Sequence, residues 1–181
     1  MLDLIHARSP DDIAAARELF LEYAESLGFS LCFQNFDKEV AELPGAYAEP
    51  TGRLLVARLD GKVAGCIALR PIDERICEMK RLYVRPEARG HGIGWALALT
   101  LLDEASGIGY SSMRLDTVPG KMDAAISMYR ALGFHDILAY CVNPIPGALY
   151  FEIGLPASME FASGTAVDAA VQRLVKLKKK P

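Results

Sequence analysis

The chain reads RPEARGHGIGWALA from Arg85 to Ala98, a glycine-rich loop followed at once by a run rich in alanine and leucine. A β-type run over residues 75–84 precedes the loop. The order strand, loop, helix places three alternate glycines, at positions 90, 92 and 94, where a helix begins. There the backbone can approach a ligand closely, and the unpaired N–H groups of the first helical turn favour an anion such as a pyrophosphate. The stretch therefore predicts a phosphate-binding loop.

Two familiar phosphate-binding loops do not fit this stretch. A Walker A loop continues with Lys-Ser/Thr after its last glycine, but Gly94 is followed by Trp95 and Ala96. A dinucleotide fingerprint needs a further glycine, and neither position 95 nor position 97 supplies one. Such a fingerprint also opens its βαβ unit, whereas three strand-like runs precede this loop. A tight turn that binds nothing remains as the alternative.

Periodicity outward from the loop predicts alternating strands and helices in one α/β domain. Ser9 and Pro10 offer a helix N-cap and a first-turn proline, and Asp60-Gly61 is a strong hairpin signal between two strands. We expect strands at 2–7, 53–59, 62–70, 75–84, 113–117, 134–142 and 149–155, and helices at 13–27, 37–43, 93–105, 121–132 and 167–179. Hairpins in the middle and helix crossovers later predict a mixed sheet with helices on both faces.

Length and composition favour a single active site. The 181 residues, 51% of them hydrophobic, suffice for one substantial core, and we expect a domain at residues 1–156 with an extension at 157–181. The basic end of the extension complements a helix dipole, and docking to an anionic partner is the alternative. A formal charge of -3 gives no support to a nucleic-acid partner.

The remaining compositional features favour a cytoplasmic protein without a metal. The chain shows no signal-peptide pattern at residues 1–12 and no run approaching the ~20 apolar residues of a membrane span. We therefore expect no membrane association. Four cysteines stand far apart without a CxxC pair or a His-rich segment. We expect them to be reduced and mostly packed.

The loop also fills the signature Arg/Gln-x-x-Gly-x-Gly/Ala with Arg89, Gly92 and Gly94. In this it resembles the GCN5-related N-acetyltransferase (GNAT) family. The resemblance extends to EMKRLYV at 78–84, which looks like the family's fourth strand, to LDT at 115–117, which looks like its fifth, and to AISMYRALGF at 125–134. It covers about residues 1–156, and it implies a mostly antiparallel sheet of about seven strands, with a splayed parallel pair formed by strands four and five.

The resemblance implies acetyl-CoA as co-substrate and main-chain binding of it. The pantetheine arm would lie in the gap between strands four and five, and an oxyanion-type amide would face the thioester carbonyl. The residues that match the family's cofactor-binding positions are Leu82, Val84, Arg89, Gly90, His91, Gly92, Ile93, Gly94 and Tyr129. Many members carry an asparagine seven residues before the tyrosine, and Met122 replaces it here.

Direct attack by an amine needs a base and an acid. The resemblance implies Glu78 as the general base and Tyr129 as the general acid that protonates the leaving thiolate. On a strand of period two, Glu78 and Leu82 would project from one face. Glu78 could instead be a charge paired with Lys80 or Arg81, and Tyr129 a core aromatic beside Phe134. A covalent route through Cys77 is disfavoured, because alternation turns it to the other face and no histidine is placed to activate it.

The acceptor is expected to be a small-molecule or peptide amine. The irregular segment 29–50 and the turn at 143–147 are expected to line its pocket, with Gln34, Asn35, Tyr140 and Asn143 as candidates. An acidic wall around Glu78 would suit a cationic amine. Two other readings stay open: a CoA-binding regulatory module without turnover, and a scaffold acting through the basic tail. Whether two copies form a homodimer is also left open.

Overall fold

The structure, a computed structural model, describes residues 1–31 and 35–155. Within these residues seven strands form one sheet in the order β1-β2-β3-β4-β5-β7-β6. Only β4 and β5 pair in parallel, and all other neighbours are antiparallel. The strands are β1 (Leu2–His6), β2 (Arg53–Leu59), β3 (Lys62–Pro71), β4 (Ile76–Val84), β5 (Ser112–Thr117), β6 (His135–Asp136) and β7 (Leu149–Gly154). The predicted sheet is confirmed, and the predicted extension at 157–181 lies outside the described residues.

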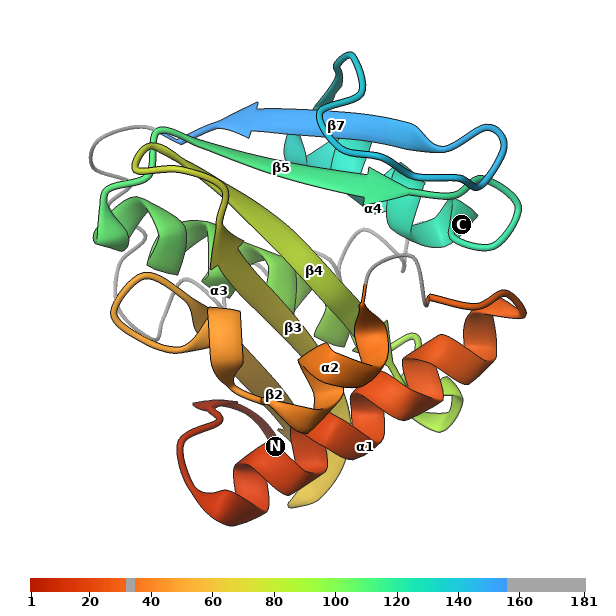
Figure 1. Ribbon diagram of the computed structural model, residues 1–181. Coiled ribbons are helices and arrows are strands. Elements are labelled where there is room, and N and C mark those ends of the chain that lie inside the picture. The colour runs from red at the N-terminus through yellow and green to blue at the C-terminus, as the bar shows by residue number, and fades with distance from the viewer. Residues whose placement is uncertain (32–34, 156–181) are drawn as a thin grey trace, which may run out of the picture.

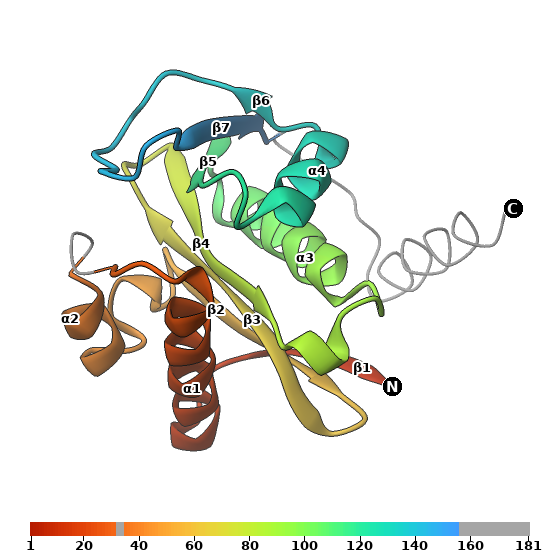
Figure 2. The same ribbon diagram turned by 90° about the vertical axis from the view of Figure 1, so that its right-hand side faces the viewer.

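Helices cover both faces of the sheet, as predicted (Figures 1 and 2). The helices α1 (Pro10–Leu27) and α2 (Phe36–Ala41) lie on one face, and α3 (Ile93–Ile108) and α4 (Asp123–Leu132) on the other. Each face has its own core: Leu19 and Phe20 of α1 are completely buried on the first, and Leu97 and Leu101 of α3 on the second. Because α1 and α3 both contact β2, β3 and β4, side chains on either face of β4 are buried.

Local signals set the element ends where they were expected. The hydroxyl of Ser9 accepts a hydrogen bond from the amide of Asp12 at 3.2 Å and caps α1. At the β2–β3 hairpin, Asp60 and Gly61 have φ angles of 50° and 78°, the left-handed conformation that a tight two-residue turn requires.

The strands β4 and β5 separate along their length. They are paired only from Ile76 opposite Ser112 to Glu78 opposite Arg114. Beyond those residues β4 runs on to Val84 and β5 to Thr117, and Figure 1 shows the two ribbons diverging. The splayed pair is thus confirmed, and it opens the sheet between its two halves.

A β-bulge interrupts β4 inside this open part. Ala68 of β3 lies opposite Lys80 and Cys66 opposite Tyr83, so β4 contains one more residue than its partner strand. Arg81, with φ of 57°, is the residue in the left-handed conformation. Gly65 makes room for the distortion, because a Cβ atom there would lie 2.5 Å from the carbonyl oxygen of Tyr83.

The bulge overturns one sequence-based prediction. Leu82 and Val84 pack against the α3 core, whereas Tyr83 belongs to the α1 core. Glu78 precedes the bulge and Leu82 follows it. The inserted residue reverses the alternation, so Glu78 and Leu82 project from opposite faces, and the prediction that they share a face is wrong.

The predicted strand at 134–142 is also wrong in extent. Only His135 and Asp136 pair with β7, opposite Glu152 and Phe151. The chain then leaves the sheet and forms a loop over residues 137–148, whose polar side chains reach toward β4 and β5.

Candidate active site

A groove of about 440 Å³ runs beside the open part of β4. Its floor is formed by the end of β4, one wall by the start of α3 and the other by α4 and the end of α1. Seven of the eight predicted cofactor residues of β4 and the loop line it: Leu82, Val84, Arg89, Gly90, Gly92, Ile93 and Gly94. The eighth, His91, does not line it, and its Nδ1 lies 3.2 Å from the carbonyl oxygen of Ala88.

The N-terminus of α3 opens onto this groove. Its N-cap is Gly92, with φ of 77°, so no side chain satisfies the first N–H groups of the helix. The first turn carries no acidic residue. Lys121 and Arg89 line the groove as well and add positive charge. The groove can therefore bind a pyrophosphate through main-chain N–H groups, as the sequence predicted.

Gly94 lies on the groove side of α3. A Cβ atom built there would lie 3.8 Å from Met128 Sδ and 3.9 Å from Val84 Cγ2, which are ordinary contacts. The protein alone would therefore tolerate alanine at this position. What the missing side chain leaves open is space within the groove.

A second, smaller cavity of about 40 Å³ continues the groove into the gap between β4 and β5. Tyr23, Leu27, Leu82, Met122 and Tyr129 line both spaces. A thioester lying along the groove would therefore reach the strand gap beside Leu82 and Tyr129. Sequence reasoning missed Tyr23 and Leu27, because their periodicity is that of an ordinary packing face.

Tyr129, the predicted acid, lines both the groove and the small cavity. Its side chain is buried in α4, and its ring packs edge-on against Phe134 with centroids 5.7 Å apart. Burial raises the pKa of its hydroxyl group, which stays protonated at neutral pH. Among the described residues the hydroxyl has no hydrogen-bond partner. The interpretation as a core aromatic beside Phe134 is confirmed, and the role as general acid stays a prediction.

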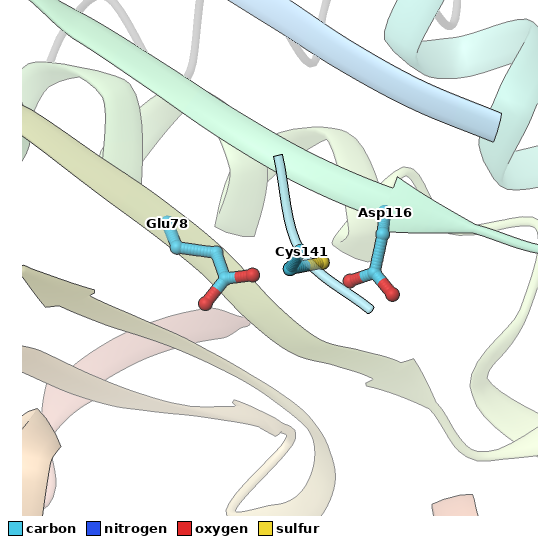
Figure 3. Close-up of side chains that lie close together, drawn as sticks. All are labelled: Glu78, Asp116 and Cys141. Carbon is cyan, nitrogen blue, oxygen red and sulfur yellow. The ribbon is translucent and has the colours of Figure 1, made fainter. Parts of the chain in front are cut away.

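Charged side chains gather where β4 and β5 part, on the α1 side of the sheet. Figure 3 shows Glu78 on β4, Asp116 on β5 and Cys141 of the loop between β6 and β7 converging on this point. Lys80 Nζ lies 3.6 Å from Glu78 Oε1 and 3.1 Å from Asp116 Oδ1. Ligand atoms of Glu78, Asp116 and Cys141 lie within 4.8 Å of one another, but the Lys80 ammonium already provides the positive charge between the two carboxylates.

The carboxylate of Glu78 is buried and has several polar partners. Its carboxylate accepts a hydrogen bond from Arg70 Nε at 2.7 Å and another from the hydroxyl of Tyr140 at 2.8 Å. Only 2% of the residue is exposed. The interpretation as a paired charge is confirmed for Lys80, and Arg70 is a partner that sequence reasoning missed. The expected acidic wall is wrong, because Arg70 and Lys80 neutralise it.

The predicted acceptor residues separate into two places. Tyr140 and Asn143 come together at the charged cluster, where Asn143 Nδ2 donates to Asp116 Oδ2 at 2.8 Å. Asn35 lines a different pocket, of about 200 Å³, beside Arg70 and Tyr47. Gln34 lies outside the described residues.

The structure gives no support to a covalent route through Cys77. Cys77 is completely buried in the core under α3, and burial raises the pKa of its thiol to about 12. Cys66 is equally buried, and Cys141 is exposed. All three are free thiols, whereas Cys32 lies outside the described residues. A thiol with so high a pKa is a poor nucleophile at neutral pH, which leaves direct transfer as the favoured chemistry.

Comparison with known proteins agrees with this geometry. An uncharacterised N-acetyltransferase of Schizosaccharomyces pombe is 40% identical over 146 residues, which is 80% of this chain and 89% of the relative. The IAA acetyltransferase of Azospirillum brasilense is 43% identical over 58% of this chain and 69% of its own. The crystal structure of PaiA N-acetyltransferase from Thermoplasma acidophilum, in complex with coenzyme A, matches 85% of this chain and 99% of its own at 19% identity and a TM-score of 0.66.

The fold and the relatives are those of an acetyl-CoA-dependent N-acetyltransferase. The chain belongs to the acetyltransferase (GNAT) family, whose model matches residues 13–134. Over the residues that the structure describes, every helix is too short or too polar to cross a membrane.

Proposed function

We propose that this enzyme acetylates the amine of a small molecule or peptide by direct attack on acetyl-CoA, without a covalent acyl-enzyme. The observation that carries the proposal is the continuity of the groove with the strand gap, both lined by Leu82 and Tyr129. Phosphates at the start of α3 would direct the acyl end to the gap, and the charged cluster lies on the far side of that gap.

Residues of this chain can supply the groups that the transfer requires. The amine lone pair forms the N–C bond while the C–S pair passes to sulfur, and the buried hydroxyl of Tyr129 gives its proton to the departing thiolate. The amide of Leu82 would donate to the thioester oxygen as negative charge develops there. The nitrogen must lose one proton to a carboxylate or to water.

The strand gap favours a compact acceptor group. Its cavity is small, and the charges around it are paired with one another, so a highly charged polyamine gains little there. The free thiols of Cys66, Cys77 and Cys141 support a reducing compartment, and we place the enzyme in the cytoplasm. Gel filtration will decide whether it is a homodimer.

The test is release of thiol from acetyl-CoA, followed with a thiol-reactive chromophore against a panel of amines. The panel contains amino acids, aromatic and aliphatic monoamines, spermidine and a short peptide with a free N-terminus. We expect turnover with a monoamine, an amino acid or the peptide. Calorimetric binding of CoA without thiol release for any member would instead favour the regulatory module.

A further inference from the structure

Asp116 lies in the open part of the strand pair, whereas Glu78 lies at its closed end. The last paired residues are Glu78 and Arg114, and Asp116 follows two residues later on β5. Lys80 follows Glu78 by the same two residues on β4, so the two side chains face each other across the gap. Asp116, Lys80 and Asn143 border the small cavity that Leu82 and Tyr129 also line, and Glu78 does not.

The two carboxylates also differ in their cationic partners, of which Glu78 has two and Asp116 has one. Glu78 receives Arg70 and Tyr140 through hydrogen bonds and has Lys80 at 3.6 Å. Asp116 receives Lys80 on Oδ1 and Asn143 on Oδ2. A carboxylate has about four lone-pair positions, so each of the two has room for a further donor, but only Asp116 borders the small cavity.

The surroundings keep Asp116 ionised although it is almost buried. Burial alone would raise the pKa of its carboxyl group, but Lys80, Asn143 and the more distant Arg81 hold the pKa below its ordinary value. Glu78 from β4, Tyr140 and Cys141 from the loop, and Tyr23 from α1 also face this region. Of these groups only Glu78 carries a carboxyl group, and Arg70 pairs with it.

We propose that Asp116 is the carboxylate that meets the acceptor nitrogen and accepts its proton, with Lys80 and Asn143 as the residues that position it. This inference rests on the proposed function. The nitrogen becomes strongly acidic once its lone pair has formed the N–C bond. Its proton then passes to Asp116, while Tyr129 protonates the sulfur, and both groups exchange protons with water before the next cycle.

The decisive experiment compares Asp116→Asn with Glu78→Gln, each an isosteric removal of charge. The acceptor is the amine from the panel with the fastest wild-type turnover. For Asp116→Asn we expect kcat/KM at pH 7 to fall by about 100-fold or more, and the deficit to narrow toward pH 9.5, where hydroxide can take the proton. Binding of CoA, measured by calorimetry, should stay within about twofold of wild type. Glu78→Gln should lose less than about tenfold, because it acts only through its neighbours.

A second variant guards against a purely structural effect. Asp116→Ala leaves a space that formate can fill, and we expect added formate to restore part of its rate. Formate should not change the rate of Asp103→Asn, a remote carboxylate of α3 that serves as the matched control and should keep wild-type activity. Rescue by a small carboxylate is not expected if Asp116 only supports the fold.

The outcomes separate the two proposals. Wild-type turnover together with an unimpaired Asp116→Asn variant would overturn the role of Asp116 and leave the proposed function standing. The same conclusion follows if Glu78→Gln is the variant whose loss disappears at high pH, or if formate fails to restore Asp116→Ala. A wild-type protein that binds CoA but acetylates no amine would overturn both.

Discussion

The guanidinium of Arg81 donates to both carboxylate oxygens of Glu39, at 2.8 Å from Nε and 2.7 Å from Nη2. The two residues come from β4 and α2, and the pair is almost buried. Arg81 also lies over the rings of Phe36 and Tyr23, at 5.1 Å and 5.9 Å from their centroids. These contacts hold a non-glycine residue in the left-handed conformation at the bulge, and thereby orient the part of β4 that lines the groove.

Replacing Glu39 by glutamine should test this support. The change leaves the Arg81 charge buried with only a neutral partner, and we expect the free energy of unfolding to fall by about 3–5 kcal/mol. The measurement is urea denaturation. Glu42→Gln is the control, because Glu42 is exposed and, among residues 1–31 and 35–155, forms an ion pair only with Lys38, at 3.9 Å. Its effect should stay below about 1 kcal/mol. Equal effects of the two changes would contradict the structural role of the buried pair.

The loss of folding stability at acidic pH should depend on the same ion pair, Glu39 and Arg81. Glu39 is buried, which would raise its pKa, but Arg81 and Tyr47 hold the pKa below its ordinary value, and the pKa of Asp116 is lowered too. A lowered folded-state pKa stabilises the protein above the unfolded-state pKa of about 4, and the contribution is lost as the pH falls through the folded-state value. As the pH is lowered below about 4, we expect the urea concentration at the unfolding midpoint to decrease. The decrease should be less steep in Glu39→Gln than in wild type. Parallel curves for the two proteins would show that Glu39 does not contribute.

Gly94→Ala should separate cofactor binding from stability. The added methyl group projects into the groove without a clash in the free protein, and alanine favours a helix. We expect calorimetry to show CoA affinity roughly tenfold lower, about 1.4 kcal/mol, with an unchanged or higher melting temperature. Gly107→Ala, in the same helix with no atom within 4 Å of the added Cβ, should raise stability and leave CoA affinity unchanged. If both variants bind CoA like wild type, the phosphates do not approach α3 at Gly94.

Tyr129→Phe should affect turnover alone. Removing the hydroxyl takes away the proposed acid, and we expect the maximal rate of thiol release to fall by about 10²-fold. The melting temperature should hardly change, because the hydroxyl has no partner among the described residues. Tyr110→Phe gives the opposite pattern: its hydroxyl donates to the carbonyl oxygen of Thr51 at 2.8 Å, so its loss should cost about 1 kcal/mol of stability and no activity. An unchanged rate for Tyr129→Phe would remove it from its proposed role.

The sequence predicted the donor side of the site more completely than the acceptor side. Donor binding depends on a glycine loop, a helix start and a strand, and each of these has a local signal. The bulge at Arg81 has none, because its cause is the carboxylate of Glu39, 42 residues earlier in the chain. Strand periodicity alone therefore predicted, wrongly, that Glu78 and Leu82 share a face of the sheet.

The acceptor side is built from contacts between residues far apart in the sequence. Tyr140 reaches Glu78 across 62 residues, and Asn143 reaches Asp116 across 27. The apolar residues from Phe134 onward predicted a strand as far as residue 142, but the hydrogen bonds of Tyr140 and Asn143 hold this segment over the charged cluster instead. The sequence predicted Asp116 only as a residue of the strand at 115–117 and not as a site residue. No residue close to it in the sequence indicates that Lys80 will lie opposite it.

The loop between β6 and β7, residues 137–148, fastens to the sheet through Tyr140 and Asn143, and neither side chain lines the groove at the start of α3. If the proposed function holds, sequence changes in this loop alter which amine is accepted and leave the groove beside α3 unchanged. Residues 137–148 can then be exchanged between relatives to change the acceptor, with acetyl-CoA kept as the acetyl donor.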